Sequence, residues 1–137
     1  MVESATAQKP VPVPDVASLP FWEAARQRRL VVQHCDDCGG DQYPPDLICR
    51  WCQSERLSFV ETSGRGVIYT FAVYTRSFMA GFEAPYVLAL VDLDDGWTIT
   101  TNIVGCDPGE VTIGMQVAVA FQRQDDTISL PYFAPRT

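Results

Sequence analysis

Four cysteines in two closely spaced pairs are the residues of this sequence best suited to do chemistry. Two residues separate the cysteines within each pair and ten separate the pairs, which are Cys35, Cys38, Cys49 and Cys52. Two tight turns of this kind can bring four thiolates to the corners of a tetrahedron. Zn²⁺ accepts that geometry, with Zn–S distances of about 2.3 Å. The spacing therefore predicts one zinc ion per chain.

The expected zinc is structural, because a catalytic zinc keeps one ligand position open for water and four cysteines close the site. Gly39 follows the first pair, where such a turn needs a residue that adopts positive φ. Tyr43, Pro44 and Pro45 supply a stiff reversal between the pairs. The alternatives are two disulfides, a thioredoxin-type dithiol and iron in place of zinc. Disulfides are disfavoured because the sequence shows no secretory signal. A thioredoxin-type dithiol would need one cysteine pair, not two. Iron is disfavoured because nothing in the sequence indicates redox chemistry.

Outside the cysteine pairs, the sequence offers few of the usual parts of an active site. His34 is the only histidine and directly precedes the first pair, while Cys106 lies alone in a turn-rich stretch. A nucleophile elbow, a Walker loop and a dinucleotide-binding glycine motif are all missing. We therefore predict no catalytic residue and expect the chain not to be an enzyme.

Length and charge restrict the class of protein. The chain has 137 residues, the size of one domain or of two very small ones. No apolar run approaches the roughly 20 residues that span a bilayer, and without a secretory signal the expected location is the cytoplasm. Residues 77–137 carry eight acidic residues against two basic ones. Because such a surface repels phosphate backbones, a single-stranded nucleic-acid-binding module is the less favoured alternative function.

Three parts are expected along the chain: a flexible proline-rich arm over 1–17, a helix and zinc ribbon over 18–56, and a barrel with a C-terminal tail over 57–137. Ser18 is the expected cap of a helix over about 19–29, and 30–33 the strand that enters the ribbon. Five runs rich in Val, Ile, Thr and aromatics are the expected barrel strands, at 57–61, 66–74, 86–94, 97–104 and 116–122. Five short strands without a long helix favour an OB-fold, with a small sandwich as second choice.

Several motifs, taken together, resemble a known family. They are Pro20–Glu23, the two cysteine pairs, Ser63–Tyr69, Ala84–Tyr86 and the closing Leu130–Phe133. This set is similar to the zinc-ribbon plus OB-fold family catalogued as domain of unknown function thirty-five, over nearly all of residues 19–135. The resemblance implies a mainly β fold: an N-terminal helix, a rubredoxin-like zinc ribbon and a five-stranded OB-fold barrel.

The resemblance also implies a function. Members occur beside or fused to enzymes of acyl-CoA metabolism, including thiolases, thiolase-fold aldolases and hydratases. The implied role is a non-catalytic accessory subunit or domain that docks on a thiolase-fold acyl-CoA enzyme, such as a retro-aldol lyase of steroid side-chain degradation, and helps to hold the CoA thioester. The implied state is a hetero-oligomer. From charge and hydropathy, we expect neither nucleic acid nor membrane as a partner.

Two sets of side chains are candidate contacts for these partners. Arg26, Arg29 and Arg65 are expected to meet the phosphates of CoA, because guanidinium groups bind phosphate through paired hydrogen bonds. Tyr43 and Trp51 offer flat, rigid faces to a protein partner. The alternative for each residue is a solvated arginine or a core aromatic.

Overall fold

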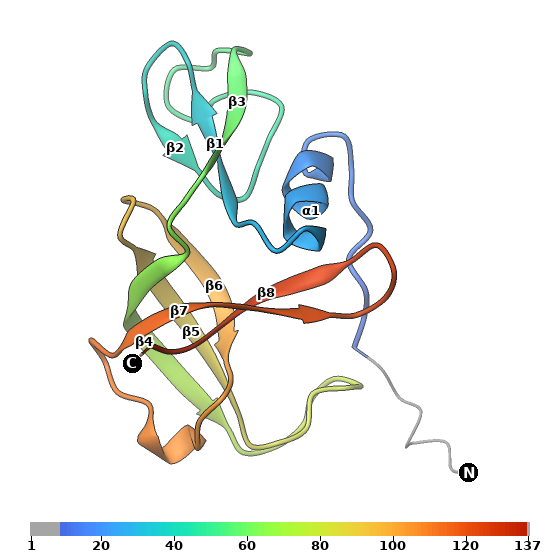
Figure 1. Ribbon diagram of the computed structural model, residues 1–137, viewed down its shortest axis with the longest axis vertical. Helices are drawn as coiled ribbons and strands as arrows, with labels where there is room; N and C mark the ends of the chain where they lie inside the picture. Colours follow the sequence, from blue (N-terminus) through green and yellow to red (C-terminus); the bar gives the residue numbers. More distant parts are fainter. Residues whose placement is uncertain (1–8, 137) are drawn as a thin grey trace.

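A small sheet and one helix stand above a closed barrel in the computed structural model, which describes residues 9–136 (Figure 1). Helix α1 spans Leu19–Arg26. The upper sheet has the order β2-β1-β3 and consists of β1 (Val31–Cys35), β2 (Asp41–Gln42) and β3 (Leu57–Glu61). The barrel has the order β4-β5-β6-β8-β7 and consists of β4 (Arg65–Tyr74), β5 (Tyr86–Leu93), β6 (Thr98–Ile103), β7 (Gln116–Arg123) and β8 (Ser129–Pro135). The predicted mainly β fold with a five-stranded barrel is confirmed.

Helix α1 is shorter than the sequence predicted. It ends at Arg26 because Arg28 takes a left-handed conformation, with φ at 62°, and turns the chain toward β1. Ser18 occupies the N-cap position, but its hydroxyl accepts a hydrogen bond from the backbone N–H of Asp15 and makes no cap bond. The apolar face of the helix is buried, so packing, more than capping, holds α1 in place.

Strand β3 forms with the predicted bounds, but its predicted place in the barrel was wrong. Its five residues pair with β1, from Val31 opposite Glu61 to Cys35 opposite Leu57. The boundary expected at residue 57 thus falls at the start of a ribbon strand. The fifth barrel strand is β8, which sequence analysis did not assign because prolines lie at 131 and 135. A proline is tolerated in a strand where no backbone N–H is needed, and β8 meets β6 at one residue pair only.

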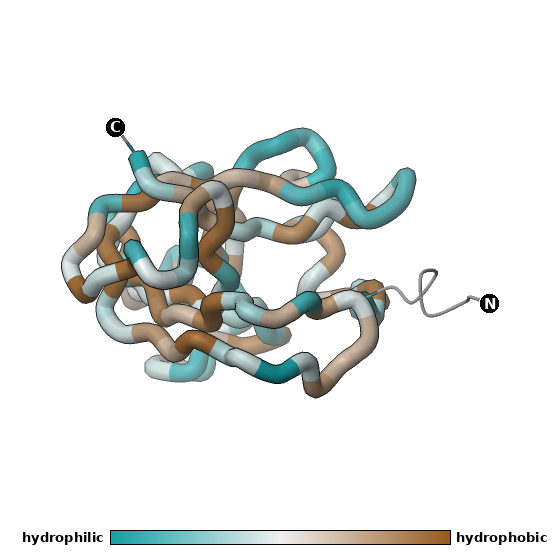
Figure 2. Tube along the Cα trace, turned by 90° about the horizontal axis from the view of Figure 1, so that it is seen from below, coloured by the Kyte–Doolittle hydropathy of each residue, from teal (hydrophilic) through white to brown (hydrophobic). Residues whose placement is uncertain are grey.

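The barrel core follows from alternation along its strands. In β5 every second residue is buried, namely Val87, Ala89, Val91 and Leu93. A hairpin turn at Asp95-Gly96, a residue pair typical of such turns, joins β5 to β6, with Gly96 at φ 100°. Hydrophilic residues concentrate at turns, most clearly at the tip of the β7–β8 hairpin (Figure 2). No helix among residues 9–136 is long and apolar enough to cross a membrane.

The arm predicted at 1–17 lies partly outside the described residues, which exclude 1–8. From Lys9 the chain runs past the β7–β8 hairpin and then up to the start of α1 (Figure 1). The Lys9 ammonium donates to the Tyr132 hydroxyl at 2.7 Å and to Gln122 Oε1 at 3.0 Å. Residue 9 is therefore in contact with the barrel wall.

Candidate metal centre and partner surface

The four predicted cysteines come together at the end of the upper sheet. All four Sγ atoms lie within 4.8 Å of one another. The Cys35–Cys52 and Cys38–Cys49 sulfur pairs are each 3.6 Å apart. Four sulfurs around one ion at about 2.3 Å would be separated by about 3.8 Å. The donor set and its spacing therefore fit one tetrahedral metal ion.

Two similar backbone turns position these thiols. In the first, the N–H of Gly39 donates to the Cys35 carbonyl at 2.9 Å; in the second, the N–H of Gln53 donates to the Cys49 carbonyl at 2.8 Å. Gly39 has φ at 79°, as the sequence predicted, and Gln53 takes the same role with φ at 65°. Sequence analysis missed Gln53 because its side chain gives no sign of a left-handed conformation.

Backbone N–H groups also favour the thiolate form of the buried cysteines. The backbone N–H of Cys52 lowers the pKa of the Cys49 thiol to about 6, and the backbone N–H of Cys38 lowers the pKa of the Cys35 thiol. The N–H of Trp51 lies 3.4 Å from Cys49 Sγ. At Cys38 and Cys52 a backbone N–H also lowers the pKa, but neighbouring thiols and burial outweigh it and raise the pKa of both thiols. Because metals bind thiolates and not thiols, the surroundings of Cys35 and Cys49 suit a metal ligand.

Two buried glutamines fix the loop between the cysteine pairs. Gln42 Nε2 donates to Gln33 Oε1 at 2.6 Å, and Gln33 Nε2 donates to the Asp46 carbonyl at 2.8 Å. Gln42 Oε1 in turn accepts from the backbone N–H of Arg50 at 2.9 Å. This network holds the backbone on both sides of Cys49 and so places the second turn. Sequence analysis did not single out either glutamine, since the pairing depends on the β1–β2 register.

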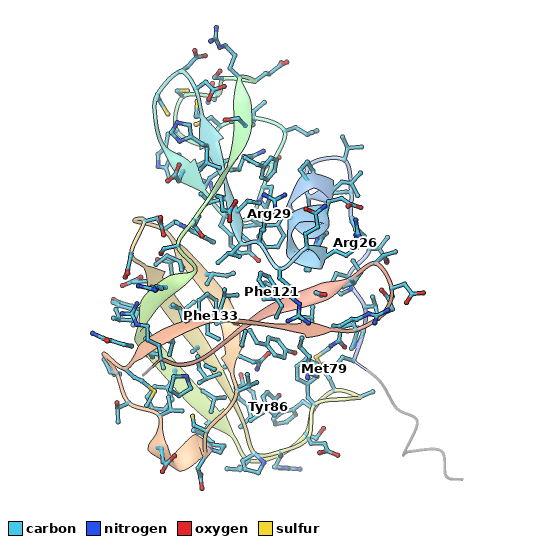
Figure 3. All side chains as sticks on the ribbon, viewed as in Figure 1. Arg26, Arg29, Met79, Tyr86, Phe121 and Phe133 are labelled. Atoms are coloured by element: carbon cyan, nitrogen blue, oxygen red, sulfur yellow. The ribbon has the colours of Figure 1, made fainter. Side chains whose placement is uncertain are left out.

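The three arginines expected at CoA phosphates are in different surroundings. Arg26 pairs with Glu23 at 3.0 Å, and Arg29 pairs with Glu61 at 3.5 Å. In the view of Figure 3, these two arginines lie on either side of α1. The side chain of Arg65 is exposed at the start of β4 and has no ion-pair partner among residues 9–136. No contact joins the three side chains into one cluster within that range.

Tyr43 lies in the contact between the ribbon, the helix and the barrel. Its ring centroid is 5.4 Å from that of Phe21 in α1 and 5.5 Å from that of Trp97 in the β5–β6 turn. Burial raises the pKa of its hydroxyl. These aromatic contacts help to fix the orientation of the ribbon relative to the barrel, and Tyr43 is half-buried there.

Trp51, in contrast, is 59% exposed on the second cysteine turn. The Arg50 guanidinium lies 5.5 Å from the Trp51 ring centroid. Two further exposed apolar residues, Leu47 and Ile48, lie on the same loop, just before and beside Cys49. We call Leu47, Ile48 and Trp51 the ribbon patch. Sequence analysis found Trp51 but missed the other two, because exposure of an aliphatic residue depends on what the fold leaves uncovered.

Comparison with known proteins places this architecture. The family model described as "ChsH2, rubredoxin-like zinc ribbon domain" matches residues 22–58, and "ChsH2, C-terminal OB-fold domain" matches residues 59–122. A DUF35 domain-containing scaffold protein of Methanothermobacter thermautotrophicus is 34% identical over 125 residues, which cover 85% of this chain and 94% of that protein. The chain belongs to the DUF35 family. The resemblance seen in the sequence is thereby confirmed.

Two further relatives connect this DUF35 chain with enzymes. A probable enoyl-CoA hydratase alpha subunit of Thermomonospora curvata is 41% identical over 116 residues. The match covers 84% of this chain but only 36% of that subunit. The solved structure "Ltp2-ChsH2(DUF35) aldolase" contains a chain that is 38% identical, with a TM-score of 0.83; the match covers 90% of this chain and 98% of that one.

Proposed function

We propose that this DUF35 chain is a non-catalytic accessory subunit or domain that docks on an acyl-CoA enzyme of the thiolase fold. The likeness to the chain in the Ltp2-ChsH2(DUF35) aldolase carries the proposal, because it extends over nearly the whole of both chains. We propose a retro-aldol lyase as the partner. A steroid side chain as the acyl group of its substrate, implied by the sequence resemblance, is part of the same proposal.

The metal in this proposal is one zinc ion, held by Cys35, Cys38, Cys49 and Cys52. Four thiolates leave no position for water, so the ion has a structural role. Its binding free energy contributes to folding, because the unfolded chain does not hold the four ligands together. The zinc would order the loop that carries the ribbon patch.

The ribbon patch is the surface proposed for docking. Its three side chains lie within five residues of one loop, which the glutamine network and the metal hold in place. Exposed apolar groups on a rigid loop bind a partner with little loss of conformational entropy. Tyr43, the other partner contact predicted from the sequence, is half-buried, and its exposed part is proposed to touch the partner.

Contact with the CoA thioester is proposed through arginines. Arg65 is the first candidate, since a phosphate would not have to displace a carboxylate from it, whereas Arg26 and Arg29 would exchange Glu23 and Glu61 for phosphate. Charge-assisted, bidentate bonds to phosphate make such an exchange favourable in a complex.

The test is reconstitution with the acyl-CoA enzyme encoded beside this chain. Co-expression should yield a complex that persists through size-exclusion chromatography, and the enzyme should gain solubility or turnover in its presence. This chain alone should turn over no acyl-CoA. Catalysis by the chain alone, or an enzyme that neither binds it nor changes its activity, would contradict the accessory role.

A further inference from the structure

A cavity of about 700 Å³ lies away from the ribbon, beside the connection between β4 and β5. It is bounded by that connection, the end of β6, the β7–β8 hairpin and Lys9 of the arm. Figure 3 shows its residues Met79 and Tyr86 on the opposite side of the β7–β8 hairpin from α1. Neither the cysteines nor the ribbon patch contribute to it, and its size suits a small organic molecule.

One part of the cavity wall is apolar and aromatic. Tyr86 stacks on Tyr74, with ring centroids 5.0 Å apart and an interplanar angle of 15°. Phe82 packs against Tyr86 at 5.4 Å, and Met79 and Ile103 complete this wall. Because Tyr86 packs against two other rings, this surface is pre-arranged for a flat or ring-shaped ligand.

The other part of the wall presents hydrogen-bond donors. The Lys9 ammonium has three N–H groups and uses two, on Tyr132 and Gln122. It also lies over the rings of Tyr132 and Phe82, at 4.6 and 5.1 Å from their centroids. The Tyr132 hydroxyl accepts from Lys9, which leaves its own hydrogen free to donate. One ammonium N–H and one phenolic O–H therefore remain for a ligand.

The placement of the Lys9 ammonium in this cavity favours an anion. Glu83 is the one carboxylate among its lining residues. Within residues 9–136, neither Glu83 nor any other acid lies within ion-pair distance of Lys9, whose ammonium is partly buried. A partly buried ammonium that donates to the neutral oxygens of Tyr132 and Gln122 gains from a counter-charge, whereas a cationic ligand would be repelled.

We propose that this cavity binds a small organic anion: a carboxylate carried on an aromatic or alicyclic ring. The carboxylate accepts hydrogen bonds from Lys9 and Tyr132, and the ring packs on Phe82, Tyr86 and Met79. This site lies apart from the proposed docking surface, and the inference does not depend on the accessory role.

The test uses three naphthalene derivatives of similar shape and different charge: naphthoate, the neutral naphthylmethanol and the cationic naphthylmethylammonium. Each is titrated into the full chain, and binding is followed by shifts of the backbone amide signals in NMR spectra. The carboxylate should bind, with shifts at residues 79–86 and near Tyr132. The neutral probe should bind about tenfold more weakly, as loss of a charge-assisted hydrogen bond requires. The cationic probe should bind least.

Variants separate a direct contact from overall charge. Lys9→Gln should weaken carboxylate binding about tenfold and leave the neutral probe unaffected, while Lys9→Arg should retain carboxylate binding. Arg76→Gln removes a cation from the same connection that does not line the cavity, and should have little effect. Equal binding of the three probes, equal loss in both glutamine variants, shifts confined to other regions, or no carboxylate binding at millimolar concentration would overturn the proposal.

Discussion

Cys49 is the ligand whose removal reports most directly on the metal. It is buried, and it lies next to the Gln42 network that positions the second turn. Cys49→Ser should abolish stoichiometric zinc binding and disorder the ribbon, because the three remaining thiolates no longer complete the site that joins the two cysteine turns. Elemental analysis and amide spectra measure both effects. Cys106→Ser, which removes the thiol outside the cluster, should keep about one zinc per chain; full zinc in Cys49→Ser would contradict the assignment.

Trp51 separates docking from folding. Its ring is mostly exposed, so Trp51→Ala should leave zinc content and the unfolding midpoint nearly unchanged. Affinity for the partner enzyme should fall at least about tenfold, as for other exposed aromatic anchors. Binding measured by calorimetry tests this directly. Ile113→Ala provides a matched control, because Ile113 is as exposed but lies on the barrel before β7; similar losses in both variants would exclude the ribbon patch as the docking surface.

At this scale, predictability depends on how local the information is. The cysteine cluster could be predicted because all four cysteines lie within 18 residues and their spacing suits one tetrahedral site. The surroundings of Tyr43 could not, because they depend on Phe21 and Trp97, which come from two other elements. The exposure of Leu47 and Ile48 has the same origin.

Among the elements, the close pairing of β4 with β5 depends on Gly66. A Cβ at this position would press on the Asp92 backbone carbonyl and lie 2.9 Å from Val91 Cγ1. Gly66→Ala should therefore separate the paired strands and reduce the free energy of unfolding by about 1–3 kcal/mol, as overpacking does. Urea unfolding measures the change. Gly109→Ala, where the nearest atom would be at 3.4 Å, should be close to neutral; equal effects would disprove the steric explanation.

The tip of the β7–β8 hairpin depends on the Asp125 carboxylate, which accepts from the backbone N–H groups of Thr127 and Ile128, each at 2.8 Å. These N–H groups, first that of Thr127 and then that of Ile128, lower the pKa of Asp125. A carboxyl whose folded-state pKa lies below its unfolded value of about 3.9 stabilises the fold above that pH. This stabilisation is lost as pH falls through the folded-state pKa.

Asp125→Ala should therefore lower the thermal midpoint at neutral pH, and the difference from the unmodified chain should shrink as pH falls below about 4. Asp126→Ala is the control at the adjacent position, where the carboxylate is almost fully exposed and, among residues 9–136, pairs with Arg123 alone. A difference that stays constant through the acid range would show that the Asp125 charge is not responsible.

Alternation and turn residues predicted most strand positions, but not which strands pair. The run at 57–61 has the composition of any barrel strand, and only the approach of β1 assigns it to the ribbon. Conversely, sequence analysis did not assign β8 because it contains two prolines. A proline lacks the backbone N–H and fits a strand only where no neighbouring strand needs that donor. Pairing is set by three-dimensional context, which a local pattern does not contain.

For the whole molecule, charge distribution leads to a prediction about nucleic acid. Zinc ribbons and OB barrels both occur in proteins that bind single strands, but residues 77–137 of this chain carry eight acids against two bases. Binding to a single-stranded oligonucleotide should be undetectable at physiological salt, because there is little counterion release to gain. Fluorescence anisotropy tests this. A micromolar complex that weakens with added salt would favour the nucleic-acid alternative.

The two sides of β8 are paired to very different extents in the closed barrel. Strand β8 pairs with β7 over seven residues but meets β6 only at Ile103 and Phe133, supported by the bond from Thr101 Oγ1 to the Pro131 carbonyl at 2.8 Å. Local opening begins where the fewest bonds must break. The barrel should therefore open locally between β6 and β8, with β7 and β8 moving together. The Val104 amide donates across this boundary to the Phe133 carbonyl, so the exchange of its proton with solvent would report that motion.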